Sequence, residues 1–319
     1  MTILPSYVLI TPARNEAQFI EGTLKSVVAQ TVPPRKWVIV SDGSTDGTDE
    51  IVRRYLDAYP WIELIRMPER ADRHFAGKVL AFNAGYERIR SLGAEIVGNL
   101  DADVTFEPDH FEYLVGRAAA HPELGVFGAP FREGEFQYDY RYTNIENVWG
   151  GCQLFRRQCY DDIGGYKPIK GGGIDHIAVV AARMNGWMTR TFTERVCIHH
   201  RVMGTAQQGS VKSKFRMGAK DYSVGNHPVW QMSRALYQVR NRPYVLGAFA
   251  LAAGYLWSAL RRSEVRVTPE MVRFIRREQM ARLGNLVGVR KNQKLAIAAK
   301  VASEPRDRSA SSGMSRSGL

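Results

Sequence analysis

Cysteine is scarce in this chain of 319 residues, and the spacing of its three cysteines excludes the common cysteine-based sites. Cys152, Cys159 and Cys197 include no C-x-x-C pair of the kind that binds zinc or carries out redox chemistry. An odd number of cysteines also cannot form a complete disulfide framework, which is typical of small secreted domains. We therefore expect three reduced thiols in a cytosolic protein.

The beginning of the sequence lacks the features of a secretory signal. Between Met1 and the apolar segment that starts at Tyr7 there is no basic region, no long apolar region and no cleavage site of small residues. We therefore expect that no signal directs this chain across a membrane.

Apolar residues and positive charge are plentiful. Hydrophobic residues make up 45% of the chain, enough for one large core or for one core and a smaller appendage. The net charge of +12 is uneven, because residues 1–200 hold 22 basic and 26 acidic side chains. Residues 201–260 hold eight basic side chains and one acidic one, and residues 261–319 hold 14 and five. A basic appendage suits an anionic membrane surface, whereas a nucleic-acid-binding protein should carry its basic stripe on the folded core, so we predict no nucleic-acid partner.

Short β-rich apolar segments alternate with segments whose apolar residues recur at helical spacing. The predicted strands are residues 7–11, 37–40, 62–65 and 95–100, and the predicted helices are residues 16–30, 48–59 and 78–90. This alternation predicts an α/β fold with a doubly wound, mostly parallel sheet. Polar clusters at residues 14–16, 42–44 and 101–103 each follow a strand directly. Because ligands of such sheets bind outside the carboxyl ends of the strands, all three clusters should line one crevice.

Asp101 and Asp103 form a D-x-D pair at the end of an apolar strand. Two carboxylates on a loop are the ligands with which proteins hold Mg²⁺ or Mn²⁺ together with substrate phosphates. An isolated pair of acids can equally cap the next helix, here one expected to start near Pro108. The two neighbouring polar clusters favour the metal site.

Four motifs follow one another between Thr11 and Asp103. They are Thr11-Pro12-x-Arg14-Asn15-Glu16, Ser41-Asp42-Gly43-Ser44-Thr45-Asp46, Gly77-Lys78-x-x-Ala81-x-Asn83-x-Gly85 and Asp101-x-Asp103. In this order they resemble the landmarks of the family 2 inverting glycosyltransferases, of the type that builds bacterial polysaccharides and glycolipids. The resemblance implies the GT-A fold, a nucleotide-sugar donor such as a UDP-sugar, and Mn²⁺ or Mg²⁺ as cofactor. It assigns the nucleotide sugar to Pro12, Arg14, Glu16, Asp42, Lys78 and Asp101, and the metal to Asp103.

The resemblance continues through Gly150, Gly151 and Arg156, which are similar to the acceptor-side segment of the family. Further on, Asp175 stands where the family has the second member of an acidic pair, which is its general base. Ile174 replaces the first member, so any help from that acid is absent here. The alternative is that Asp175 only caps a helix over residues 177–184.

A late histidine and a basic segment complete the predicted site. His199 and His200 end a predicted strand at residues 195–198, and several GT-A enzymes supply a histidine to the metal or diphosphate here. Only one of the two can face the crevice because neighbours on a strand point in opposite directions, and we prefer His199. The basic segment that follows holds Lys212, Lys214, Arg216 and Lys220, in a stretch that we expect to be a loop. We assign Arg216 to the donor diphosphate, with solvated or lipid-facing charge as the alternative.

The resemblance and the charge distribution divide the chain into three parts: a GT-A catalytic domain at residues 1–203, a basic and apolar helical region at residues 204–302, and a disordered tail at residues 303–319. Residues 244–260 are apolar and uncharged but shorter than the ~20 residues of a typical spanning helix. Arginines flank them, which favours attachment in the plane of the membrane interface over a span or a buried helix. We expect the protein at the cytoplasmic face of the cell membrane.

These features predict direct displacement of a nucleotide diphosphate by an acceptor hydroxyl, with inversion. The expected acceptor is a lipid-linked or membrane-proximal glycan, such as one carried by a polyprenyl lipid. The processive Q-x-x-R-W motif is incomplete at residues 231–235, which favours transfer of a single sugar. Two alternatives remain: a degenerate nucleotide-binding scaffold of a polysaccharide assembly complex, and a sugar nucleotidyltransferase, whose glycine-rich phosphate loop has no counterpart at residues 12–15.

Overall fold

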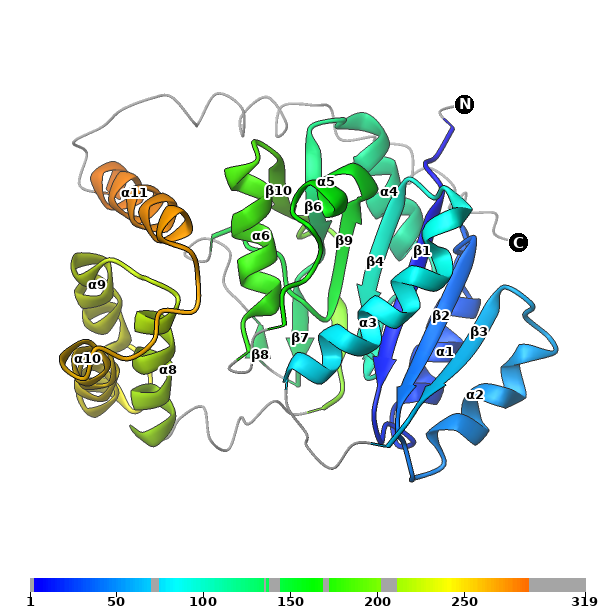
Figure 1. Ribbon diagram of the computed structural model, residues 1–319, viewed down its shortest axis with the longest axis horizontal. Helices are drawn as coiled ribbons and strands as arrows, with labels where there is room; N and C mark the ends of the chain where they lie inside the picture. Colours follow the sequence, from blue (N-terminus) through cyan, green and yellow to red (C-terminus); the bar gives the residue numbers. More distant parts are fainter. Residues whose placement is uncertain are drawn as a thin grey trace, which may run out of the picture.

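A seven-stranded sheet forms the centre of the protein, in a computed structural model that describes residues 3–69, 75–134, 136–137, 144–168, 172–201 and 211–286 (Figure 1). The strand order is β10-β6-β9-β4-β1-β2-β3. β9 runs antiparallel to both neighbours, and the other adjacent pairs are parallel. The strands are β1 (Tyr7–Ala13), β2 (Lys36–Asp42), β3 (Ile62–Met67), β4 (Ile96–Leu100), β6 (Leu124–Gly128), β9 (Cys152–Arg156) and β10 (Met188–Thr191).

A second, four-stranded sheet has the order β5-β11-β7-β8. Its strands are β5 (Val104–Thr105), β7 (Phe131–Glu133), β8 (Phe136–Gln137) and β11 (Cys197–His199). β11 pairs antiparallel with β5 and parallel with β7. This pairing brings three segments that are distant in sequence to one place beside the central sheet.

Helices cover both faces of the central sheet, as its apolar strands require (Figure 1). One face packs against α1 (Ile20–Val28), α2 (Thr48–Leu56) and α4 (His110–Ala120). The other packs against α3 (Phe75–Ile89), which a short 3₁₀ turn (Arg90–Leu92) follows, α5 (Arg157–Asp162) and α6 (Ile174–Met184). The predicted α/β class and the doubly wound, mostly parallel sheet are confirmed.

The first helix begins later than the sequence pattern predicts. We expected it from residue 16, but α1 starts at Ile20. Asn15 has a positive φ of 55°, and the N–H groups of Glu16 and Ala17 donate to the side chains of Thr48 and Asp46. These contacts hold the intervening segment in a non-helical conformation.

Beyond residue 210 the described chain is helical and lies to one side of α6 (Figure 1). The helices are α8 (Val211–Ser223), α9 (Pro228–Gln238), α10 (Tyr244–Leu260) and α11 (Pro269–Leu286). The expectation of a loop around Arg216 is therefore wrong, because this basic segment is α8. α8 and α10 pack closely at two glycines: a Cβ on Gly218 would lie 2.0 Å from the carbonyl oxygen of Leu251, and one on Gly254 would lie 1.9 Å from that of Phe215.

Within the described ranges, no helix has both the length and the apolar character needed to cross a membrane. The tail predicted to be disordered, residues 303–319, lies outside these ranges.

The glycine contact between α8 and α10 yields a stability prediction. Gly254→Ala should lower the free energy of unfolding by about 1–3 kcal/mol, because its Cβ forces apart two helix backbones. Gly284→Ala in α11 is the matched control, since nothing lies within 4 Å of its Cβ position, and helix propensity should leave stability equal or higher. Urea unfolding followed by circular dichroism measures both. Equal midpoints for the two variants would contradict the close packing.

Candidate active site

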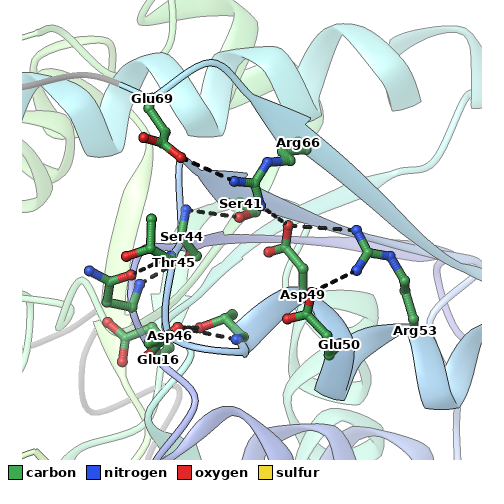
Figure 2. Close-up of polar contacts among 12 residues, drawn as sticks. Glu16, Ser41, Ser44, Thr45, Asp46, Asp49, Glu50, Arg53, Arg66 and Glu69 are labelled. Carbon is green, nitrogen blue, oxygen red and sulfur yellow. Dashed lines mark hydrogen bonds and ion pairs between the residues drawn. The ribbon is translucent and has the colours of Figure 1, made fainter.

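The loops that follow β1 and β2 are tied together by side chains of the second sequence motif (Figure 2). Ser44 Oγ accepts from the N–H of Asn15 at 3.1 Å, and Thr48 Oγ1 accepts from the N–H of Glu16 at 2.8 Å. In return, Asn15 Oδ1 accepts from the N–H of Thr45 at 2.9 Å. The hydroxyl groups of Ser44, in this motif, and of Thr48, just after it, therefore position the first loop and its acidic residue.

Asp42 and Arg14 lie at the ends of neighbouring parallel strands. Oδ2 of the buried Asp42 is 3.7 Å from Nη1 of Arg14, which directly follows β1, and Pro12 lies within that strand. Gly43 follows Asp42 with a φ of 69°, and a Cβ there would lie 2.8 Å from Cα of Glu69. Only glycine fits this turn without displacing the neighbouring chain.

Asp101 directly follows β4 and is paired with a lysine from α3. Nζ of Lys78 lies 2.5 Å from Oδ1 of Asp101, and the N–H of Asp101 donates to the carbonyl of Gly151 at 2.8 Å. The third and fourth sequence motifs thus meet at this edge of the sheet.

Asp103 faces His199, which lies on β11 of the second sheet. Oδ2 of Asp103 is 3.4 Å from Nε2 of His199, whose Nδ1 is 3.3 Å from Oε2 of Glu133. All three side chains are buried. Burial alone would lower the pKa of His199, but the hydrogen bonds and charges of Asp103 and Glu133 outweigh it and raise this pKa. Likewise, burial would raise the pKa of Asp103, and the positive partners His199 and Arg201 lower it instead.

Of the two histidines, the structure brings His199 and not His200 to the carboxylates of Asp103 and Glu133. His200 is exposed, and its Nε2 lies 2.8 Å from the hydroxyl of Thr105, outside the acidic cluster. Alternation along the strand separates the two rings.

Arg201 joins the loops after β1 and β4. Its guanidinium contacts the carboxylate of Glu16, and its Nε lies 3.2 Å from Oδ2 of Asp103. Burial raises the pKa of Glu16 to about 7, although the charge of Arg201 opposes this. Sequence reasoning assigned no role to Arg201 or Glu133. The two-residue spacing of His199 and Arg201 was the one available signal for Arg201, and Glu133 had none.

The side chains of Asp101, Asp103 and His199 offer donor atoms that fit a hard divalent cation. Two carboxylates and an imidazole nitrogen suit Mn²⁺ or Mg²⁺, and a proton on Nδ1 of His199 donated to Glu133 leaves the lone pair of Nε2 facing Asp103. Oε1 of Glu133 is buried and makes no hydrogen bond within the described part of the chain, so this oxygen can still accept a further partner.

A second donor cluster lies in the core, away from this edge. His110, Cys152 and Cys197 are buried, and their donor atoms lie within 4.8 Å of one another. The pairing of β9 and β11 with their neighbours brings the two thiols together, which their sequence spacing did not indicate. All three cysteines are free thiols, as expected, and this soft set is distinct from the carboxylate set that suits Mn²⁺.

Asp175 lies in the first turn of α6 and lines a cavity of about 500 Å³. The helix begins at Ile174 with Gly173 as its N-cap, so Asp175 does not cap it, contrary to the alternative interpretation. The same cavity is lined by Lys78 and Asp101, and by the glycines of the predicted acceptor segment, Gly150 and Gly151. A Cβ on Gly150 would lie 2.7 Å from Cβ of Asp175, so this glycine lets the carboxylate approach the strand edge.

Two predicted site residues need correction. Arg156 ends β9 at the opposite edge of the sheet, because β9 runs antiparallel and its register pairs Arg156 with Ile96 at the start of β4. Its guanidinium donates to the carbonyls of Leu124, Ala118 and His121, which is a structural role.

The second correction concerns α8. Arg216 is exposed on this helix and does not line the cavity beside Asp175. Lys220, one turn later, does line it. Arg216 and Lys220 share a face of α8, and it is the later position along the helix that brings Lys220 to the cavity.

Comparisons with known proteins agree with this arrangement. The pattern of "Glycosyl transferase family 2" matches residues 8–168. Glycosyltransferase AglE of Haloferax volcanii is 27% identical over 291 residues, which are 84% of this chain and 89% of AglE. A poly-beta-1,6-N-acetyl-D-glucosamine synthase of Staphylococcus epidermidis is 31% identical over 117 residues, which are 36% of this chain and 26% of the synthase.

Solved structures share the fold. The mannosyltransferase PcManGT from Pyrobaculum calidifontis, in complex with GDP-Man and Mn²⁺, has a TM-score of 0.54 at 21% identity and covers 95% of this chain and 81% of that protein. S. aureus TarS 1–349 in complex with UDP-GlcNAc has a TM-score of 0.50 at 14% identity, covering 85% and 78%. The expected GT-A fold is confirmed. With its family pattern over residues 8–168 and relatives that are themselves glycosyltransferases, the chain is a glycosyltransferase and belongs to glycosyl transferase family 2.

Proposed function

We propose that this glycosyltransferase is metal-dependent and inverting, and that it moves one sugar from a nucleotide sugar, with a UDP-sugar as our first choice, to a lipid-linked or membrane-proximal glycan. The observation that carries the proposal is that Asp101 and Asp175 line one cavity while Asp103 and His199 face each other beside it. A metal-binding edge and a separate carboxylate are the two parts that such a displacement needs.

The donor side of the site supports binding of a diphosphate and a divalent cation. Asp101, Asp103 and His199 would hold Mn²⁺ or Mg²⁺, which when bound stabilises the charge on the departing diphosphate. Lys78 and Arg201 add positive charge at the same edge. Asp42 and Arg14, on the neighbouring strands, would bind the nucleoside.

Asp175 is the residue that would accept the proton of the attacking hydroxyl. It reaches the cavity from α6, whereas the donor-side groups come from the loops after β1, β2 and β4. Attack from the base side, opposite the leaving diphosphate, inverts the configuration of the transferred sugar. With Ile174 in place of a second acid, Asp175 would act alone.

The two solved structures contain different nucleotides and therefore do not identify the donor nucleotide of this chain. PcManGT was solved with GDP-Man and TarS with UDP-GlcNAc, so both GDP-sugars and UDP-sugars should be tested as donors. The incomplete Q-x-x-R-W segment favours a single transfer. In the structure, Arg234 of this segment pairs with Asp221 at 2.6 Å.

The helices α9 and α10 support the proposed attachment to an anionic membrane. They pack against each other, and their outer surfaces expose large apolar side chains, including Leu236, Leu246, Phe249 and Leu260 at 65–80% exposure. We call this the apolar α9–α10 face. Arg242 and Arg261 lie at the two ends of α10 and are exposed. Apolar insertion flanked by basic groups suits the cytoplasmic leaflet.

The first prediction for this function concerns the metal. A panel of UDP- and GDP-sugars with Mn²⁺ should reveal at least one donor that the wild-type chain hydrolyses, and Asp103→Ala should remove both its metal dependence and most turnover. A lost carboxylate ligand weakens cation and diphosphate binding together. Full wild-type activity in excess EDTA would contradict the metal assignment, and hydrolysis of no donor would favour a non-catalytic scaffold.

The second prediction concerns the base. Asp175→Asn should leave nucleotide binding nearly intact but lower transfer by roughly 10² or more, because the amide keeps the shape of the side chain but cannot accept a proton. Calorimetry with UDP or GDP, beside a transfer assay, separates the two effects. A collapse of nucleotide affinity would instead indicate a structural role.

The third prediction concerns the membrane. The full chain should float with anionic vesicles more than with neutral ones. High salt should not release it completely, because salt screens the attraction between basic side chains and anionic lipids but does not weaken apolar insertion. The double variant Leu246→Asp/Phe249→Asp should lose this binding. Leu80→Asp is the control, since Leu80 is 44% exposed on α3, outside the apolar α9–α10 face. Equal flotation of both variants would remove the membrane proposal.

A further inference from the structure

Two cavities adjoin beside Asp175. The inner one, of about 500 Å³, contains Asp175 itself, and an outer one of about 930 Å³ lies where α6 faces α8, α9 and α11. Four residues line both cavities: Asn147, Gly173, His176 and Lys220. Each volume lies within the range of about 300–1,000 Å³ that accommodates a drug-sized ligand. The two cavities together therefore hold far more than one sugar ring.

The wall of the outer cavity combines apolar surface with charged side chains, and most of these charges compensate one another. Three ion pairs supply most of the charged groups: Arg183 with Glu278, Arg282 with Glu146, and Arg234 with Asp221, at 2.9, 2.7 and 2.6 Å. Such a wall offers many fixed hydrogen-bonding groups without a large net charge. Apolar surface beside hydrogen-bonding groups suits an uncharged ligand that has both hydroxyl groups and apolar C–H faces. A lipid chain would remove water from the three ion pairs, and a multiply charged phosphate would find little net positive charge.

Tryptophan side chains are present in both cavities. Trp149 lines the inner cavity, where its ring packs against Phe131 at a centroid distance of 4.5 Å, and Trp230 lines the outer one. Both are half-buried. A sugar ring has apolar C–H faces and a rim of hydroxyls, so a flat aromatic ring beside paired polar groups matches both of its surfaces.

Lys220 stands at the junction of the two cavities. It reaches Gly173, where its Nζ would lie 3.5 Å from an added Cβ, and within the described residues its ammonium group has no ion-pair partner. The N–H groups of this ammonium can donate to a hydroxyl or ring oxygen of a ligand that passes from one cavity to the other.

From these observations we propose that the two cavities form one acceptor groove, which binds a glycan of at least two sugar units. The terminal unit lies in the inner cavity with its hydroxyl at Asp175, and the following units lie in the outer cavity against Trp230. This inference rests on the proposed transfer reaction and adds the substrate class: an oligosaccharide, rather than a monosaccharide or the lipid itself, is what the enzyme recognises.

The test uses the full chain and a donor that the wild type hydrolyses. The acceptors are octyl glycosides of one to four units of glucose, mannose, galactose or N-acetylglucosamine, together with a farnesyl phosphate monosaccharide. We expect kcat/KM to rise about tenfold from the one-unit to the three-unit acceptor of the preferred sugar, equivalent to about 1.4 kcal/mol, mainly through a lower KM. Trp230→Ala should abolish this gain while donor hydrolysis and one-unit transfer fall less than about twofold.

The control variant is Trp61→Ala, which also removes a half-buried tryptophan but lies beside β3, far along the sheet from the groove. It should keep the full gain with acceptor length. Circular dichroism of all variants checks that they are folded.

The outcomes separate this inference from the function on which it rests. If no donor is hydrolysed, the proposed function fails and the groove fails with it. If a donor is hydrolysed but kcat/KM is independent of acceptor length, or Trp230→Ala lowers one-unit and three-unit transfer equally, only the groove is wrong. A farnesyl phosphate monosaccharide that matches the three-unit acceptor would likewise overturn it, because the outer cavity would then bind the lipid.

Discussion

The concentration of carboxylates at one edge of the central sheet is the constraint on which the site depends. Glu16, Asp101 and Asp103 come to this edge because parallel strands end there, and their mutual repulsion must be compensated. Lys78 and Arg201 provide fixed positive charge. The compensation is direct and local, because each positive group contacts its carboxylate through a side chain from a neighbouring loop or helix.

The second, four-stranded sheet adds a histidine to this edge of the central sheet. β11 lies between β5 and β7, and that pairing buries His199 between the carboxylates of Asp103 and Glu133. A histidine held from both sides has a fixed ring orientation, which is what a metal ligand needs. The four-stranded sheet therefore acts as a support for one side chain.

The C-terminal helices belong to the catalytic arrangement as well as to the proposed membrane contact. Arg183 of α6 pairs with Glu278 of α11, and Arg282 of α11 pairs with Glu146, so α11 is tied to the catalytic domain. The outer cavity lies along this junction. Both the outer cavity and the apolar α9–α10 face are therefore formed in part by α9.

The sequence by itself determined the alternation of strands and helices and the four landmarks from Thr11 to Asp103, because strand ends, turns and D-x-D spacing are set by neighbouring residues. It also indicated Asp175, through the family resemblance, and His199, through its two-residue spacing before Arg201. Only the tertiary structure decided the rest: that Glu133 holds His199, that antiparallel β9 carries Arg156 away from Gly150, and that a helical α8 presents Lys220 in place of Arg216. Strand direction, sheet order and the packing of distant segments depend on the whole core, and no local pattern encodes them.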